Sequence, residues 1–142
     1  MESRALEPKD EGARLIRLDS HGDDATGYLS VFETHDIGFD VARIYYIYDV
    51  PCGIQRGMHA HPNLKQALFC PYGSIEVSID DGRGHKDAYM LDEPSKCLIV
   101  PERVWREMVW REQGSVLVVA ASLPYDQTVY IRDYSEFLDL VG

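Results

Sequence analysis

The stretch that decides the fold runs from residue 53 to residue 73 and reads GIQRGMHAHPNLKQALFCPYG. Five residues separate Gly53 from His59, four separate His61 from Gln66, and six separate Gln66 from Gly73. On a β-strand, residues two apart point to the same face and lie about 6.5 Å from each other. We therefore expect His59 and His61 to project together into one interior, which Gln66 reaches from the next strand.

That spacing resembles the first signature of the cupin superfamily, which usually has Glu where this chain has Gln66. Cupins carry a second signature, in which two glycines and a proline precede a further histidine. Residues 95–106 are the matching stretch, with Pro101 in register, but Ser95 and Arg103 replace the glycines and Arg106 replaces the histidine. The resemblance implies a cupin fold, which is a double-stranded β-helix or jelly-roll barrel.

The second signature decides the prediction about a metal. A typical metal-binding cupin holds its ion with three imidazoles and one carboxylate. The corresponding groups here are the imidazoles of His59 and His61, the neutral amide of Gln66 and the guanidinium of Arg106. A guanidinium has no lone pair to offer and stays protonated, so it repels a divalent cation. We therefore predict no metal and no cofactor, which leaves both histidines free for proton transfer.

The rest of the chain has the pattern of one all-β domain. Its 142 residues, 45% of them hydrophobic, are enough for one sizeable core. Short runs rich in Val, Ile, Tyr and Leu alternate with turn residues, and only residues 133–140 have the spacing of a short amphipathic helix. We expect residues 1–13 to form a loose leader and residues 14–142 a single domain. The predicted strands are 14–18, 28–33, 41–49, 55–60, 65–72, 74–80, 85–91, 96–100, 105–109 and 115–121.

The net charge of −10 argues against nucleic acid and membrane surfaces as partners, because polyanions are repelled. No run of about 18–20 apolar residues is present, and the N-terminus is acidic where a secretory signal is basic and then apolar. These features predict a soluble, cytoplasmic protein. The odd number and wide spacing of Cys52, Cys70 and Cys97 predict buried free thiols rather than disulfides or a zinc site.

Charge is distributed unevenly along the chain. Residues 43–66 contain three basic residues against one acid, a net charge of +2, so the remainder carries −12. Arg43 and Arg56 of this segment, with Arg103 and Arg106 of the second motif, predict a guanidinium-rich mouth. Because Arg binds phosphate in a fixed fork, such a mouth suits a phosphorylated small ligand.

One predicted strand places aromatic residues on both of its faces. Arg43, Tyr45 and Ile47 lie on one face, and Ile44, Tyr46 and Tyr48 lie on the other. For Tyr46 and Tyr48 we expect cross-strand packing without chemistry. For Tyr45, which lies beside a strand-borne Arg, packing and a role in the site stay open.

Several segments together resemble the nucleotide-sugar 3,4-ketoisomerases of the WxcM-like group, over about residues 29–138. They are RIYYIYDV (43–50), RGMHAH (56–61), LKQ (64–66), VP (100–101), VWREM (104–108), YD (125–126) and YIRDY (130–134). The resemblance implies metal-independent isomerisation of dTDP-4-keto-6-deoxy-D-glucose to the 3-keto sugar. That reaction belongs to the route to 3-amino-3,6-dideoxyhexoses of surface polysaccharides such as the O-antigen of lipopolysaccharide. The resemblance also implies a homodimer whose N-terminal strands are exchanged between subunits.

In this hypothesis a base removes the proton at C3, which the C4 ketone acidifies, and the resulting enediolate is reprotonated at C4. His59 is the expected base, because a neutral imidazole has a pKa near the working pH. His61 and Tyr45 move protons to or from the two oxygens. Gln66, Arg43 or Arg106 are the expected donors to the enediolate, Arg56 and Arg103 the expected diphosphate contacts, and Trp105 the residue expected to pack near the nucleotide.

The chain departs from the usual family pattern at two places. Pro62 follows the second histidine where many members have Lys, and residues 24–27 lack the Arg of the usual Asp-x-Arg-Gly turn. The nucleotide preference and the stereochemistry at C4 of the product therefore stay open. Two alternative functions also stay open: a sugar-nucleotide 3,5-epimerase, which uses a histidine base in a cupin, and a non-catalytic sugar-nucleotide-binding module.

Overall fold

A computed structural model gives the structure of residues 12–142, so residues 1–11 of the predicted leader lie outside the described residues. The strands are β1 (Arg14–Arg17), β2 (Ser20–Asp23), β3 (Gly27–Ser30), β4 (Arg43–Ile47), β5 (Gln55–His59), β6 (Gln66–Tyr72), β7 (Ile75–Asp80), β8 (Lys86–Leu91), β9 (Lys96–Val100), β10 (Trp105–Trp110) and β11 (Val116–Ala121). The helices are α1 (Thr34–Ile37), the 3-10 turn η1 (Tyr125–Gln127) and α2 (Tyr134–Val141).

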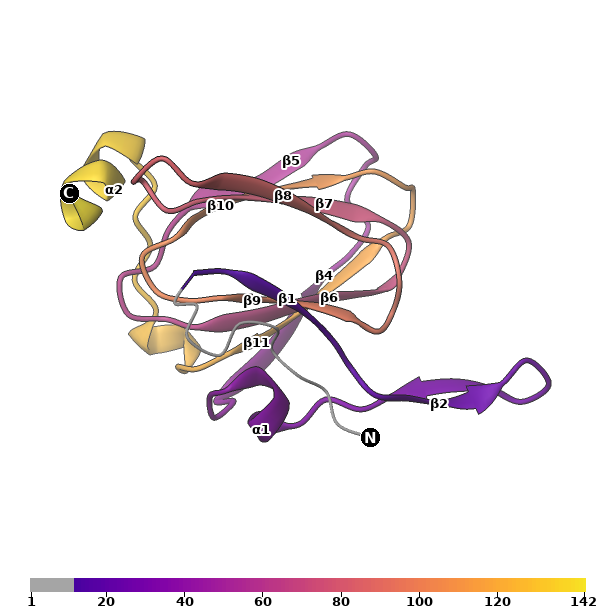
Figure 1. Ribbon diagram of the computed structural model, residues 1–142. Coiled ribbons are helices and arrows are strands. Elements are labelled where there is room, and N and C mark those ends of the chain that lie inside the picture. The colour runs from indigo at the N-terminus through magenta and orange to yellow at the C-terminus, as the bar shows by residue number, and fades with distance from the viewer. Residues whose placement is uncertain (1–11) are drawn as a thin grey trace.

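Two antiparallel sheets face each other and form a barrel (Figure 1). One has five strands in the order β1-β9-β6-β11-β4, and the other has four in the order β5-β10-β7-β8. The core between them is built from side chains that alternate inward along each strand, such as the fully buried Leu68, Leu98 and Leu117. The predicted all-β barrel is confirmed, and every predicted strand is present with its ends shifted by a few residues.

Three short elements were not predicted: β2, α1 and the 3-10 turn η1. β2 pairs with β3 in a hairpin whose residues are all exposed, and Figure 1 shows this hairpin projecting away from the barrel. Its first strand, Ser-His-Gly-Asp, contains no β-branched or aromatic residue, so its extended form comes from pairing rather than from local preference. α1 is a single turn that ends at Gly38, which adopts a left-handed conformation at φ 86°.

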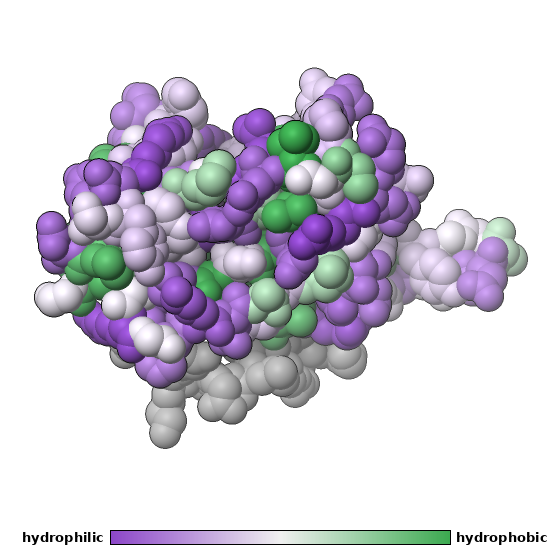
Figure 2. Space-filling model, turned by 90° about the horizontal axis from the view of Figure 1, so that it is seen from above, coloured by the Kyte–Doolittle hydropathy of each residue, from purple (hydrophilic) through white to green (hydrophobic). Residues whose placement is uncertain are grey.

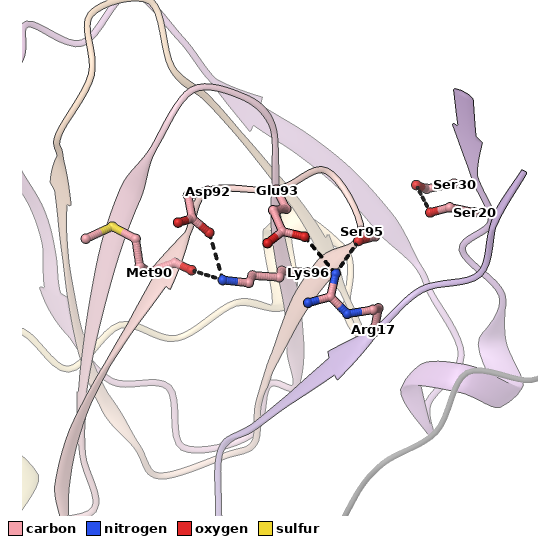
Figure 3. Close-up of polar contacts among 8 residues, drawn as sticks. All are labelled: Arg17, Ser20, Ser30, Met90, Asp92, Glu93, Ser95 and Lys96. Atoms are coloured by element: carbon pink, nitrogen blue, oxygen red, sulfur yellow. Dashed lines mark hydrogen bonds and ion pairs between the residues drawn. The ribbon is translucent and has the colours of Figure 1, made fainter. Parts of the chain in front are cut away.

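Polar side chains fix the point at which this hairpin leaves the barrel (Figure 3). Arg17, the last residue of β1, donates to Glu93 Oε1 and to Ser95 Oγ, each at 2.8 Å. The hydroxyl groups of Ser20 and Ser30 lie 2.9 Å apart at the base of the hairpin. β1 is therefore tied to β9 and to the turn before it, within the same chain.

The C-terminal part of the chain crosses from one sheet to the other. Figure 1 shows it running from η1, beside the five-stranded sheet, to α2, beside the four-stranded sheet. We call residues 124–133 the tail segment. Its Ile131 forms an isolated antiparallel bridge with Ala60. The predicted C-terminal helix is confirmed by α2. It begins after Asp133, which caps it by accepting hydrogen bonds from the backbone N–H groups of Ser135 and Glu136.

The cysteine prediction is correct for two of the three residues. Cys70 and Cys97 are buried free thiols, and burial raises the pKa of Cys70 to about 11 and that of Cys97 to about 12. Cys52 is exposed, so the prediction is wrong for this residue. It lies in the loop between β4 and β5, where its Sγ donates to the carbonyl of Arg111 at 3.3 Å.

The surface seen in Figure 2 is mostly hydrophilic, with small and separate hydrophobic groups. Neither helix of residues 12–142 has the length and hydrophobicity that crossing a bilayer requires.

Candidate active site

The barrel contains a cavity of about 190 Å³, which we call the His59 pocket. Three guanidinium groups reach its lining, and among residues 12–142 the lining includes neither Asp nor Glu. The pocket therefore carries positive charge in a protein whose net charge is −10. The lining residues are Tyr45, Ile47, Arg56, Gly57, His59, Gln66, Leu68, Arg106, Met108, Leu117, Val119, Tyr130 and Arg132.

A β-bulge sets the position of His59. Arg106 of β10 pairs with His59, but the next residue, Glu107, pairs with Gly57, so Met58 is left without a partner. Gly57 has φ 86° and Met58 has φ 59°, both in the left-handed region. A bulge of this kind bends and twists a strand end and can re-aim a side chain. The bulge thus brings His59 onto the same face of the sheet as Arg106.

His61 lies behind His59 and is 1% exposed. The two ring centroids are 4.7 Å apart, with an angle of 70° between the rings. His61 Nδ1 lies 2.7 Å from the carbonyl oxygen of Val129, which can only accept, so Nδ1 carries the proton in the neutral ring. His61 Nε2 is then a bare lone pair, and it has no hydrogen-bond partner within residues 12–142.

Arg106 is a buried cation held by neutral groups. It is 1% exposed, its Nη2 donates to the carbonyl of Val104 at 2.9 Å, and its Nη1 donates to Gln66 Oε1. The other end of the same amide, Gln66 Nε2, donates to the Tyr45 hydroxyl at 3.1 Å. Tyr45, Gln66 and Arg106 therefore form one hydrogen-bonded chain along the pocket wall.

The protonation states of the groups that line the pocket, and of His61 behind His59, follow from their burial and from the charge of Arg106. Burial lowers the pKa of His59 to about 4 and that of His61 to about 3, and the positive charge of Arg106 adds to both effects. Burial raises the pKa of Tyr45 and lowers that of Arg106 to about 10. At neutral pH the site therefore presents two neutral imidazoles, a protonated phenol and a guanidinium, a set that can take up a proton and stabilise an anion.

Of the two predicted arginines Arg43 and Arg56, one lines the pocket and the other lies next to the lining residue Tyr45. Arg56 is part of the pocket lining. Arg43 Nη2 donates to Thr128 Oγ1 at 3.1 Å, and its guanidinium lies 5.0 Å from the ring centroid of Tyr45 and 5.5 Å from that of Tyr125. The tail segment thus holds Arg43 beside Tyr45, the residue for which packing and a site role were both left open.

Two predicted site residues lie elsewhere. Trp105 is adjacent to Arg106 in β10 and so faces the opposite side, where its ring packs against Tyr134 and Phe137 at centroid distances of 5.2 and 5.6 Å. Arg103 has φ 65°, and its side chain borders a separate surface hollow near Lys65. The structure does not bring these two residues into the His59 pocket.

Two lining residues with polar side chains were missed. Tyr130 and Arg132 are two apart in the tail segment, and both face the histidines. The ring of Tyr130 contacts those of His59 and His61, with centroid distances of 5.2 and 4.8 Å. No strand was predicted there, because a single bridge at Ile131 leaves no alternating pattern in the sequence.

The groups at the usual metal position of cupins do not fit a divalent cation. Gln66 Oε1 accepts from Arg106, His61 Nδ1 faces a carbonyl, and a buried guanidinium stands at the fourth position. Within the described part of the chain, the one trio of His, Asp and Glu ligand atoms close enough to share an ion is at Glu33, His35 and Asp36, outside the pocket lining.

The protein-family model described as FdtA: WxcM-like, C-terminal matches residues 11–142. The chain belongs to this family. A curated relative, TDP-4-oxo-6-deoxy-alpha-D-glucose-3,4-oxoisomerase from Aneurinibacillus thermoaerophilus, is 39% identical over 120 residues, which are 84% of this chain and 83% of the relative. The resemblance found in the sequence motifs is thereby confirmed.

Solved structures confirm the cupin fold. A mutant of the 3,4-ketoisomerase QdtA from Thermoanaerobacterium thermosaccharolyticum, in complex with TDP-4-keto-6-deoxyglucose, has a TM-score of 0.83 and 37% identity, over 90% of this chain and 92% of that chain. An epimerase from Mycobacterium tuberculosis has a TM-score of 0.71 and 21% identity, over 88% of this chain and 69% of that chain, a likeness that shows the shared fold alone. The first two relatives have the predicted enzyme class, 3,4-ketoisomerase.

The bulge makes Gly57 essential to the site. A Cβ at Gly57 would lie 2.7 Å from Met108 Cε and 3.1 Å from the carbonyl oxygen of Arg106, at a φ that L-residues avoid. We expect Gly57→Ala to lower the free energy of unfolding by about 1–2 kcal/mol in urea titrations and to displace His59, with a large loss of activity.

Gly53→Ala is the matched control, because Gly53 has φ 88° but nothing lies within 4 Å of its Cβ position. It should lose comparable stability and keep its activity. Equal losses of activity in both variants would contradict the role of the bulge in aiming His59.

Proposed function

We propose that this protein is a sugar 3,4-ketoisomerase that converts dTDP-4-keto-6-deoxy-D-glucose to the 3-keto sugar by metal-independent acid–base catalysis. The observation that carries the proposal is a neutral His59 paired across the strands with a buried Arg106, in a pocket that no carboxylate of residues 12–142 lines. Family membership and the relatives that act on, or are seen with, TDP-4-keto-6-deoxyglucose support the same substrate.

The reaction moves a carbonyl by one position. His59 removes the C3 proton, and the C3–H electron pair enters a C3–C4 double bond while negative charge collects on the C4 oxygen. The C4 oxygen then takes up a proton and becomes the C4 hydroxyl. The C3 hydroxyl gives up its proton as its oxygen forms the C3 carbonyl, and the electron pair of the double bond takes up at C4 a proton equivalent to the one that His59 removed. Tyr45, whose hydroxyl lies in the lining, moves protons at the two oxygens, and His61 supports this transfer from behind His59.

Charge stabilisation in this mechanism comes from Arg106. A fixed guanidinium in a buried pocket lowers the energy of the enediolate without any rearrangement during the reaction. Gln66 orients it, and Arg56 is the lining arginine best suited to the diphosphate. Because Arg103 and Trp105 lie away from the pocket, we assign them no direct contact with the reacting sugar.

A 3,5-epimerase is the second candidate, since it shares the fold and the need for a histidine base. The family match favours the ketoisomerase, and so does the Tyr45–Gln66–Arg106 chain, which can stabilise an enediolate on two oxygens. A binding module without chemistry does not account for a neutral imidazole kept beside two arginines.

Incubation with dTDP-4-keto-6-deoxyglucose in deuterated water, followed by NMR, separates these functions. We expect exchange or transfer at C3 and C4 only. Exchange at C5 would indicate the epimerase, and binding without any exchange would indicate the module.

His59→Asn should lower kcat by about 10²–10⁴-fold while binding persists, because it removes the general base.

His85→Asn is the matched control, since His85 is exposed in the turn between β7 and β8. It should keep full turnover. Full activity of the His59→Asn variant would remove His59 as the base.

The absence of a metal requirement is tested separately. After treatment with EDTA and metal analysis, we expect unchanged turnover, because the donor set around Arg106 does not hold a divalent cation. A loss of activity that zinc, iron or manganese restores would contradict the metal-independent mechanism.

We also propose a homodimer, in which the β2–β3 hairpin reaches the partner. The hairpin exposes Tyr28 and Leu29, at 65% and 58%, and the outer face of β4 exposes Ile44, Tyr46 and Tyr48. Tyr46 and Tyr48 were expected to pack across strands, yet in one chain their rings contact each other and remain mostly exposed. Exposed apolar side chains grouped on one strand face, as on β4 and directly after it, are typical of subunit interfaces.

Light scattering after size-exclusion chromatography tests this dimer. We expect the wild-type protein to be dimeric and Tyr46→Glu to shift it to monomer, because a carboxylate would be buried in the interface. Tyr72→Glu, at a position exposed to a similar extent on β6, is the control and should stay dimeric. A monomeric wild-type protein at micromolar concentration would contradict the proposal.

A further inference from the structure

We propose that the tail segment supplies two positioning residues, Tyr130 and Arg132, which hold the imidazoles of His59 and His61 in their working arrangement. This inference rests on the proposed function, because it assigns roles to residues around the same base. Neither side chain exchanges a proton with the sugar in this proposal.

The register of the tail segment carries the argument. Ala60 and Ile131 exchange both backbone hydrogen bonds, each at 2.9 Å. In such an antiparallel pair the flanking residues lie opposite each other, so His59 faces Arg132 and His61 faces Tyr130. All four flanking side chains share the face that Ala60 and Ile131 do not use.

The other face explains why this register is stable. Ala60 and Ile131 are buried in a small core with Trp105, Phe137 and Val141. A slip of the tail segment by one residue would turn Tyr130 and Arg132 into that core and take Ile131 out of it. The packing of α2 therefore determines which side chains meet the histidines.

Three rings form a closed triangle at the site. The angles between the rings are 70° for His59 and His61, 77° for His59 and Tyr130, and 62° for His61 and Tyr130, all edge-to-face. Each ring therefore limits the rotation of the other two. Val129, which precedes Tyr130, accepts the hydrogen bond from His61 Nδ1 and fixes its tautomer.

Arg132 completes the arrangement from the outer side. Its guanidinium lies 4.3 Å from the ring centroid of Tyr130, so it stacks on the ring that holds the histidines. With Arg106 on β10 and Arg132 on the tail segment, His59 is flanked by a cation on each neighbouring strand. Both charges disfavour the imidazolium, in agreement with the lowered pKa of His59.

The test measures the free, full-length enzyme as well as turnover. In Tyr130→Leu we expect kcat to fall by about 100-fold with little change in KM, because a base displaced by about 1 Å loses catalysis before binding. NMR of the histidine ring nitrogens should show the pKa of His59 moving from about 4 toward its ordinary value of 6.5. Tyr130→Phe keeps the ring and should recover most of the loss.

Phe32→Leu is the matched control, because it also removes one ring from an aromatic contact, that of Phe32 with Phe69 at a centroid distance of 5.2 Å, in a core cluster that contains none of the tail segment. It should lose thermal stability like Tyr130→Leu and leave kcat and the histidine titrations unchanged. Equal losses of kcat in the two leucine variants, or unchanged histidine titrations in Tyr130→Leu, would overturn the proposal.

Arg132→Met provides a second measurement that does not remove a ring. It should raise the pKa of His59, whereas Arg132→Lys should raise it less because the charge remains. No change in Arg132→Met would overturn the role of Arg132.

If the wild-type enzyme does not turn over the keto sugar, the proposed function fails. The histidine titrations of the free proteins still decide between a positioning role and a merely structural one.

Discussion

The buried guanidinium of Arg106 is the constraint to which the rest of the site responds. Removing an unpaired cation from water costs several kcal/mol, and within the described residues no carboxylate lies in the pocket to offset this cost. The carbonyl of Val104 and the amide of Gln66 supply the hydrogen bonds that remain possible. The result is a fixed positive potential in a cavity, which favours an anion and disfavours protonation of the neighbouring imidazoles.

Gln66 follows from the same constraint. A glutamate at this position would form a buried ion pair with Arg106 and cancel the positive potential of the pocket. The amide instead orients the guanidinium with one end and donates to Tyr45 with the other. The two substitutions that separate this chain from a metal-binding cupin, Gln for Glu and Arg for His, are therefore physically coupled.

Local patterns predicted the parts of the site that lie on regular strands. Alternation placed Tyr45 and Tyr46 on opposite faces of one strand, and the spaced motif predicted that His59 and His61 lie together. The same alternation rule, applied to Trp105 and Arg106, would have shown that only one of these neighbours can face the pocket. Tyr130 and Arg132 were beyond local reasoning, because one long-range bridge, supported by the core around Phe137, sets their position.

The low basicity of His59 connects stability with catalysis. Its pKa is about 4 in the folded chain and near 6.5 in an unfolded one, so the unfolded state binds more protons as the pH falls through this interval. The free-energy contribution of His59 is therefore most favourable above pH 6.5 and is lost as the pH falls toward 4. During the reaction the charge next to His59 changes. Negative charge on the enediolate offsets the cations around His59 and raises its pKa at the moment when it accepts the proton. A pocket that weakens its base in the resting state thus strengthens it in the transition state, which is where the basicity contributes to the rate.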